Sequence, residues 1–336
     1  MSRSQPATQA NALSRRSLLT RAALGAGVLA SGLSLDTALA APRASAVIPR
    51  PRKRVLRLAH LTDIHVQPER HAGEGMAACL KHVSELADKP DLILTGGDHV
   101  MDSFEATFDR TKTQWDLFTK TWADGMNIPV RSCVGNHDAW GWNKAKSKTT
   151  GTENKWGKAM AVDALKIPAR YYSFDQAGWH FVALDSVFPN GDGYLGKLDD
   201  EQAEWLDADL AKVPKGTPTL VLSHIPILTV TSVVYTKPDK DNNYKLDGSL
   251  QHCDYARIKA IFEKHNTVKL CLSGHMHLID RCDYNGVTYL CNGAVCGNWW
   301  KGRHRDCDEG YAAINLFDDG SFEHEYIKYG WKAETK

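Results

Sequence analysis

The sequence lacks the features of several common functional classes. Its 41 lysines and arginines nearly equal its 40 aspartates and glutamates, and the net charge of +1 gives no overall field to attract nucleic acid or an anionic membrane. It contains no Gly-x-Ser-x-Gly segment to supply a serine nucleophile. It has no Cys-x-x-Cys pair of the kind found in structural zinc ribbons. Nucleic acid is therefore not an expected partner, and any hydrolytic chemistry must come from other residues.

The eight cysteines give no clear disulfide framework. Cys282 and Cys291 flank an Asn-Gly turn at 285–286. A two-residue hairpin loop there pairs Cys282 with Tyr289 and leaves Cys291 as a diagonal neighbour, so no disulfide between the two cysteines is implied. Cys296 and Cys307 could form a disulfide that closes a late loop, and the sequence leaves open whether they do.

The first forty residues have the pattern of a signal peptide. Paired arginines, Arg15 and Arg16, precede a weakly apolar stretch of 14 residues at 22–35, which is too short to span a bilayer as a helix. Ala-Leu-Ala at 38–40 offers a cleavage site. The arginine pair resembles a twin-arginine signal, although Leu18 and Thr20 replace its usual Phe and Lys. An ordinary secretory signal is the alternative, which the weak hydrophobicity of the stretch disfavours.

This pattern sets the expected domain organisation. Residues 1–40 would be a twin-arginine signal peptide, residues 41–54 a linker rich in Pro, Arg and Ala, and residues 55–336 the functional domain. We expect export in the folded state by the twin-arginine machinery, to the periplasm or outside the cell. We expect no transmembrane helix in the mature chain. At 43% hydrophobic residues, this length is sufficient for a sizeable core.

Hydrophobic periodicity in the mature chain alternates between strands and helices. Two hairpins follow, with turns at 285–286 and 318–320, and this order argues for an α/β fold with mixed sheets. Polar segments at 140–158 and 228–250 read as loops. The expected strands are 55–61, 92–94, 128–134, 171–174, 179–185, 219–223 and 268–273, and the expected helices are 75–88, 104–122, 198–210 and 255–265.

Polar side chains follow five of these apolar runs, where the carboxyl ends of strands should lie. In open α/β sheets that edge is where ligands bind. A single such segment, for example Asn-His-Asp at 136–138, could be no more than a turn. Five in one chain argue against that interpretation. The residues are Asp63, His65, Asp98, Asn136, His137, His224, His275 and His277.

Without His137 this set holds four imidazoles, two carboxylates and one amide, and no thiolate. Such donors suit zinc, iron or manganese better than calcium or copper(I). Seven ligands are too many for one tetrahedral ion but sufficient for two if one carboxylate bridges them. Two metals can clamp an in-line displacement at phosphorus while a bridging hydroxide attacks. His137, the spare imidazole, could protonate the leaving oxygen or stabilise the developing charge.

These segments, in this order, resemble the pattern of the calcineurin-like metallophosphoesterases over residues 55–329. The resemblance implies a sandwich of two mixed β-sheets flanked by helices, in four αββα layers, with a dimetal site at the strand ends. Single-domain size and Gly-Asn-His-Asp at 135–138 are most similar to the bacterial branch that includes class III cyclic-nucleotide phosphodiesterases. By motif position, the resemblance implies that one metal ion is held by Asp63, His65 and His277 and the other by Asn136, His224 and His275. It also implies that Asp98 bridges the two ions and that His137 is catalytic.

The sequence departs from two branches of that family. Purple acid phosphatases carry Tyr three residues after the bridging aspartate, where this chain has Met101, so a purple iron site is not expected. Protein Ser/Thr phosphatases place at that position an Asp that orients the catalytic histidine. Here the nearest candidate is Asp102, one residue later, and the residue that orients His137 stays open.

The expected function is an exported dinuclear-metal hydrolase of small-molecule phosphate esters, with diesters favoured over monoesters. The alternatives are a nuclease of the same superfamily and a metal-containing binding protein without catalysis. A nuclease is disfavoured because the charge balance gives no sign of a basic groove for nucleic acid. A binding protein without catalysis is disfavoured because the set of metal-binding side chains is intact. Four tryptophans are equally candidates for pocket walls or for packing: Trp140, Trp142, Trp299 and Trp300. Three late polar residues could contact a phosphate or face solvent, and solvent is the favoured expectation: Lys301, Arg303 and His304.

Overall fold

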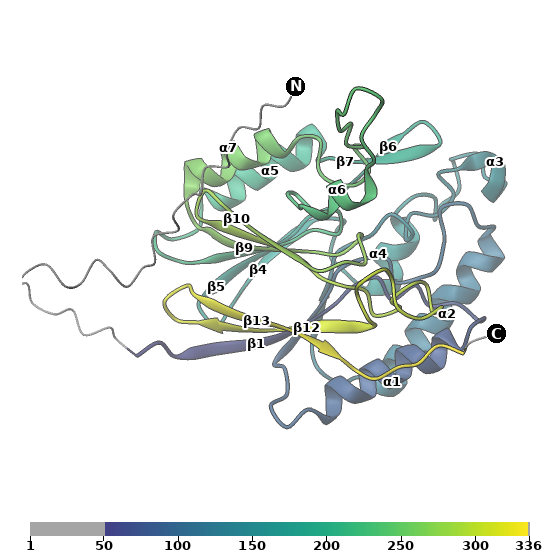
Figure 1. Ribbon diagram of the computed structural model, residues 1–336, viewed down its shortest axis with the longest axis horizontal. Coiled ribbons are helices and arrows are strands. Elements are labelled where there is room, and N and C mark those ends of the chain that lie inside the picture. Colours follow the sequence, from purple (N-terminus) through teal and green to yellow (C-terminus); the bar gives the residue numbers. More distant parts are fainter. Residues whose placement is uncertain (1–50, 335–336) are drawn as a thin grey trace, which may run out of the picture. The chain divides into compact units, whose positions relative to one another are not determined.

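The computed structural model describes residues 51–334 (Figure 1). The predicted signal peptide and residues 41–50 of the predicted linker lie outside this range. Strand β1 begins at Arg54, one residue before the predicted domain start. Lys53 already pairs with Asp318, because its backbone N–H donates to Oδ1 of Asp318 at 2.9 Å and its carbonyl accepts from the Asp318 N–H at 3.0 Å. The last residues assigned to the linker therefore belong to the fold.

The first sheet has five strands in the order β13-β12-β1-β2-β3. Strands β1, β2 and β3 run parallel, and β12 and β13 are added antiparallel at one side. The sheet is therefore mixed, as predicted. Its strands are β1 (Arg54–Leu61), β2 (Leu92–Thr95), β3 (Val130–Ser132), β12 (Gly310–Phe317) and β13 (Phe322–Lys328).

The second sheet has six strands in the order β10-β11-β9-β8-β5-β4. Its four central strands are parallel, and β4 and β10 pair antiparallel at the two edges. Cys282 lies opposite Tyr289 in the β10–β11 pair, which confirms the predicted register. The strands are β4 (Tyr172–Gln176), β5 (Trp179–Ala183), β8 (Thr219–Leu222), β9 (Val268–Ser273), β10 (Asp280–Tyr284) and β11 (Val287–Cys291).

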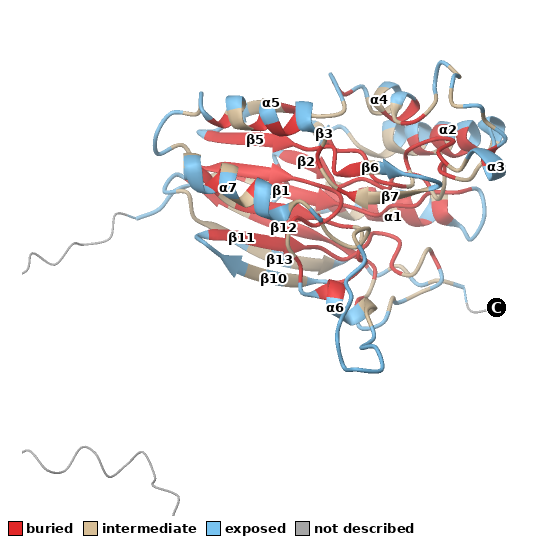
Figure 2. Ribbon diagram, turned by 90° about the horizontal axis from the view of Figure 1, so that it is seen from above, coloured by how far each residue is buried: buried red, intermediate tan, exposed pale blue. Residues whose placement is uncertain are grey.

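Helices cover the outer faces of both sheets. Figure 1 shows α5 and α7 on one side of the paired sheets and α1 and α2 on the other, which gives the four αββα layers. Figure 2 shows the strands largely buried and the outer sides of α5 and α7 exposed. No helix within residues 51–334 is both long and apolar enough to cross a bilayer. The helices are α1 (Ala72–Glu85), α2 (Phe108–Gly125), α3 (Lys144–Ser147), α4 (Ala159–Leu165), α5 (Asp200–Leu210), α6 (Thr231–Tyr235) and α7 (Tyr255–His265).

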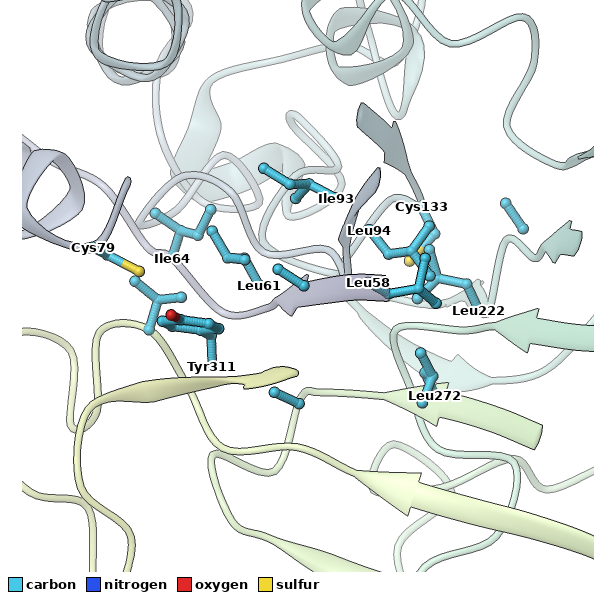
Figure 3. Packing of buried hydrophobic residues seen from close by; sticks show 14 of the residues in the cluster. Leu58, Leu61, Ile64, Cys79, Ile93, Leu94, Cys133, Leu222, Leu272 and Tyr311 are labelled. Atoms are coloured by element: carbon cyan, nitrogen blue, oxygen red, sulfur yellow. The ribbon is translucent and has the colours of Figure 1, made fainter. Parts of the chain in front are cut away.

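The apolar runs form buried strands because both faces of each sheet are covered. In β8, Leu220 and Leu222 belong to the main core, whereas Val221 packs in a second cluster with the apolar faces of α5 and α7. Figure 3 shows Leu58 of β1 with Leu222 and Leu272 between the sheets. Alternate side chains of one strand thus hold the sheets together and attach the outer helices.

Some predicted boundaries differ from the structure for local reasons. Helix α2 begins at Phe108 and not at residue 104. The Asp102 carboxylate accepts hydrogen bonds from the backbone N–H groups of Phe104 and Glu105, at 2.8 and 3.3 Å, and folds these residues into a turn. The segments predicted as loops contain the short helices α3 and α6, and a two-stranded hairpin that was not predicted joins β6 (Val187–Asn190) to β7 (Gly193–Gly196).

Candidate metal centre

The predicted site residues follow five strands from both sheets. Asp63 and His65 follow β1, Asp98 follows β2, and Asn136 and His137 follow β3, so these five come from the first sheet. His224 follows β8, and His275 and His277 follow β9, both in the second sheet. The structure brings all eight side chains together, because the carboxyl ends of these parallel strands meet where the two sheets face each other.

One group of donors consists of Asp63, His65 and His277. Nε2 of His277 lies 3.3 Å from Oδ1 of Asp63 and 3.2 Å from Nε2 of His65. Nδ1 of His277 donates to the carbonyl of Gly297 at 2.6 Å, so it is Nε2 that carries the lone pair when the ring is neutral. An imidazole lone pair therefore faces both a carboxylate and a second imidazole nitrogen, an arrangement that a cation stabilises.

A second group consists of Asp98, Asn136, His224 and His275. Nε2 of His224 lies 3.2 Å from Oδ2 of Asp98 and 3.0 Å from Oδ1 of Asn136. Its Nδ1 donates to the carbonyl of Gly96 at 2.7 Å, which again directs the lone pair of the neutral ring into the group. Asp98, His224 and His275 each offer a ligand atom within 4.8 Å of the others. These residues can hold a second cation.

Asp98 lies between the two groups. Its Oδ2 is 3.2 Å from Nε2 of His224 in one group and 3.5 Å from Nε2 of His65 in the other. Its Oδ1 accepts the backbone N–H of His137 at 2.8 Å. The side chain is buried, so its charge is not screened by bulk water. This carboxylate is therefore placed to contact cations in both groups.

Cys296 could be mistaken for another donor. Its Sγ lies 4.0 Å from Nδ1 of His277, the nitrogen already used by Gly297. Burial raises the pKa of its thiol, which keeps it neutral at pH 7. The structure has no disulfide among the eight cysteines, all of which lie in the described range, so Cys296 and Cys307 are not joined.

Two of the four predicted imidazole ligands are neutral at pH 7, and the other two, His224 and His277, have a pKa raised above its usual value. Burial lowers the pKa of His65 to about 3 and that of His275 to about 4, so both rings are neutral at pH 7. For His224, burial is outweighed by the carboxylates of Asp98 and Asp63, and its pKa rises to about 9. Although burial opposes it, the imidazoles of His224 and His137 hold the pKa of Asp98 well below its usual range. A metal ion in the second group would replace the His224 proton.

The backbone is unusual at the site. Five of the seven predicted ligands have a positive φ, a region that residues other than glycine seldom adopt. Because this conformation has an energetic cost, the surrounding packing must hold it in place. The residues and angles are Asp63 at 54°, His65 at 46°, Asp98 at 52°, His275 at 69° and His277 at 51°.

Two glycines of the sequence motifs allow carboxylates to approach the backbone closely. A Cβ at Gly135 would lie 2.2 Å from Oδ1 of Asp98. A Cβ at Gly274 would lie 1.9 Å from Oγ1 of Thr62 and 2.2 Å from Oδ2 of Asp63. These separations are shorter than any real contact, so each glycine is required by the ligand next to it.

Asp138 and His99 were not predicted to have a role, yet they hold the site. The buried Asp138 carboxylate accepts the backbone N–H groups of Gly135, Asp98 and His99 at 2.9, 3.0 and 2.8 Å. It also pairs with Nδ1 of His99 at 2.9 Å, whose Nε2 lies 2.8 Å from Oγ1 of Thr95. Asp138 was visible in the motif at 135–138, whereas a lone His after Asp98 gives no signal in the sequence.

His137 lies beside the donors, its ring 4.7 Å from that of His65. Its Nδ1 is buried and has no hydrogen-bond partner among the described residues. Oδ1 of Asp102 is the nearby carboxylate oxygen, at 3.9 Å, which is too far for a hydrogen bond. Asp102, the candidate from the sequence, therefore lies near His137 but makes no hydrogen bond with its ring.

The four tryptophans separate into two kinds. Trp140, Trp142 and Trp300 are buried in packed clusters, so packing accounts for them. Trp299 is partly exposed, and its ring centroid lies 4.6 Å from that of His277. Lys301 and Arg303 face solvent as predicted.

The prediction for His304 was wrong. Its ring is only partly exposed, because it packs 5.6 Å from the rings of both His277 and Trp299. Its Nε2 lies 2.6 Å from the Tyr235 hydroxyl, in the segment 228–250 that was read as a loop.

A surface hollow of about 670 Å³ lies elsewhere, between α1 and α2. Gln67, Leu117 and Lys120 are among the residues that line it, and none of the predicted ligands does. The chemistry of the side chains, and not the size of a hollow, therefore locates the candidate site.

Comparison with known proteins agrees with this geometry. The calcineurin-like phosphoesterase family matches residues 56–278. A 3′,5′-cyclic-nucleotide phosphodiesterase of Nostoc sp. is 26% identical, over 71% of this chain and 78% of that protein. The 3′,5′-cyclic adenosine monophosphate phosphodiesterase of Escherichia coli is 24% identical, over 72% of this chain and 76% of that protein.

A solved structure supports the same fold. The crystal structure of a dimetal phosphatase from Danio rerio superposes with a TM-score of 0.51 at 14% identity, over 83% of this chain and 100% of that one. The family match covers the segment from β1 to His277, which contains every predicted ligand. The chain therefore belongs to the calcineurin-like phosphoesterase family.

Proposed function

We propose that this phosphoesterase hydrolyses small-molecule phosphate diesters, in preference to monoesters, at a centre of two metal ions. The observation that carries the proposal is the position of Asp98, whose Oδ2 lies 3.5 Å from His65 in one donor group and 3.2 Å from His224 in the other. One carboxylate shared by two sets of nitrogen and oxygen donors is the arrangement that a dinuclear centre needs.

The donors fit such a centre. Asp63, His65 and His277 would hold one ion, Asn136, His224 and His275 would hold the other, and Asp98 would bridge them. The set consists of imidazole and oxygen donors, which iron, zinc and manganese all accept. Two such ions, when bound, supply Lewis acidity to the phosphate and acidify the attacking water.

The protein provides the rigid frame of this centre. Tautomers are fixed by carbonyl acceptors: Gly297 for His277, Gly96 for His224, and Ser249, which accepts Nε2 of His275 at 2.9 Å. Outer hydrogen bonds of this kind orient a ligand ring and raise its basicity. The backbone N–H of His275 donates to both oxygens of Asp63, at 3.0 and 2.9 Å, and holds that carboxylate in place.

His137 is our proposed catalytic residue. Its backbone N–H is bound to Asp98 at 2.8 Å, which fixes the ring next to the shared carboxylate. An imidazole there can deliver a proton to the leaving oxygen or stabilise charge that develops on the phosphate. Although its Nδ1 is buried, the His137 side chain is 30% exposed, so other atoms of the ring are accessible to substrate.

The preference for diesters is supported by the two relatives, both of which are named phosphodiesterases. A nuclease is less well supported because the net charge of +1 provides no electrostatic attraction to a polyanion. A binding protein without catalysis is less well supported because the complete donor set is accompanied by His137.

We further propose that the chain is exported, on the pattern of Arg15, Arg16 and the weakly apolar stretch at 22–35. Replacing both arginines by lysine should leave the protein in the cytoplasm if the twin-arginine machinery carries it. Cell fractionation with immunoblotting measures this. Unchanged export of the Arg15→Lys, Arg16→Lys variant would contradict the twin-arginine route and favour an ordinary secretory signal.

The proposed catalytic role predicts the behaviour of two variants. In His137→Ala, kcat/KM for bis(p-nitrophenyl) phosphate should fall roughly 10²- to 10⁴-fold while metal content stays at the wild-type level, because this ring is not a ligand. In Asp98→Ala both metal content and turnover should fall. His71→Ala, which removes an exposed histidine on the surface, is the matched control. Full activity in His137→Ala, or a preference for p-nitrophenyl phosphate over the diester, would contradict the proposal.

The close approach at Gly274 predicts a second effect. Gly274→Ala places a methyl group against Thr62 and Asp63 and should weaken metal binding about 10- to 100-fold, the usual effect of disturbing groups that orient ligands. Metal titration measures this, with circular dichroism to verify folding. Gly125→Ala is the control, because its Cβ would make only an ordinary contact of 3.4 Å with Leu80. Equal metal affinity in the two folded variants would rule out the proposed role of Gly274.

A further inference from the structure

Two adjacent tryptophans next to the candidate metal centre have a strained backbone. Trp299 has φ 49° and Trp300 has φ 65°, in the left-handed region that bulky residues seldom adopt. They lie in a tight loop after β11, closed by a hydrogen bond of 2.8 Å from the Asn298 N–H to the Gly302 carbonyl. Strain of this kind persists only where the surroundings hold it, and it concentrates at functional sites.

Trp300 anchors the loop. Its side chain is buried, and Nε1 donates to the carbonyl of His65 at 3.0 Å. It packs so closely on α1 that a Cβ at Gly75 would lie 2.2 Å from its ring. Trp300 thus has a structural role that accounts for its size and its conformation.

Trp299 has no such role. It belongs to none of the hydrophobic clusters of the described residues. Its ring instead lies 4.6 Å from that of His277 and 6.0 Å from that of His65, two of the proposed ligands of one metal ion. Its side chain is partly exposed. A large aromatic side chain is therefore held at the metal centre without contributing to the core.

His304 and Tyr235 support the indole from one side. The His304 ring meets Trp299 edge-on at 5.6 Å and an interplanar angle of 86°. Nε2 of His304 lies 2.6 Å from the hydroxyl of Tyr235, which donates to the carbonyl of Met276 at 2.6 Å. Because Met276 separates the proposed ligands His275 and His277, this chain of contacts fixes Trp299 relative to the metal centre.

We propose that Trp299 is a substrate-binding residue that stacks on a planar ring of the phosphate ester, such as a nucleobase. The inference rests on the proposed function, because it takes the phosphate to lie at the metal centre beside the indole. Aromatic side chains bind bases by stacking. A quaternary ammonium group also binds to indole faces, but it would be repelled by the two metal ions close to this ring. A neutral planar group is therefore the ligand that the site favours.

The experiment compares two phosphates that differ only in the base. Isothermal titration calorimetry on the manganese-loaded protein would give Kd values for adenosine 5′-monophosphate and for ribose 5-phosphate. The wild type should bind the adenine compound roughly tenfold more tightly. Trp299→Ala should lose this difference while its Kd for ribose 5-phosphate is unchanged, and Trp299→Phe should keep part of it.

Trp205→Ala is the matched control, because Trp205 is also partly exposed but lies on α5, with its ring 4.8 Å from that of Tyr171. This variant should keep the wild-type ratio of the two Kd values. An undiminished ratio in metal-loaded Trp299→Ala would overturn the inference. Equal affinity of the wild type for the two phosphates would also overturn it. So would binding of phosphocholine that is tighter than that of adenosine 5′-monophosphate and depends on Trp299. If neither phosphate bound in a metal-dependent way, the proposed function itself would fail.

Discussion

The ends of five strands bring together electron-rich atoms that repel one another, and the rest of the structure is arranged around them. Oδ2 of Asp98 lies 3.2 Å from Nε2 of His224, and Oδ1 of Asp63 lies 3.3 Å from Nε2 of His277. Such an arrangement needs positive charge. Without metal that charge comes from protons, which is why Asp98 and Asp63 raise the pKa of His224 to about 9 against the effect of burial. A pair of metal ions would supply the same charge and also Lewis acidity for phosphate chemistry.

The rest of the fold keeps these atoms close together. The two sheets form a rigid base, because the side chains of Leu58, Leu222 and Leu272 fill the space between them. At the strand ends the backbone adopts left-handed conformations, and Gly135 and Gly274 leave room for the carboxylates. Asp138 then ties the loop after β3 to that after β2. The unfavourable local conformations are thus compensated by hydrogen bonds and packing from distant segments.

The residues at the strand ends and the mixed-sheet fold could be predicted from sequence because both depend on local patterns. Apolar runs indicate strands, and Asp-x-His or His-x-His after a run places two donors together. The positive φ of His65, the pairing of His99 with Asp138, and the position of His304 could not be predicted. Each results from contacts between segments far apart in the chain, as His304 shows by meeting Tyr235. The β6–β7 hairpin was missed because its short strands have little periodicity.

The central claim is that two metal ions share Asp98. Anomalous diffraction from crystals of the manganese-loaded protein tests it most directly. We expect two peaks about 3.5–4 Å apart, a separation typical of two-metal hydrolases, with Asp98 between them. One peak should be bound by Asp63, His65 and His277, and the other by Asn136, His224 and His275. A single peak, or two peaks of which neither contacts Asp98, would contradict the account.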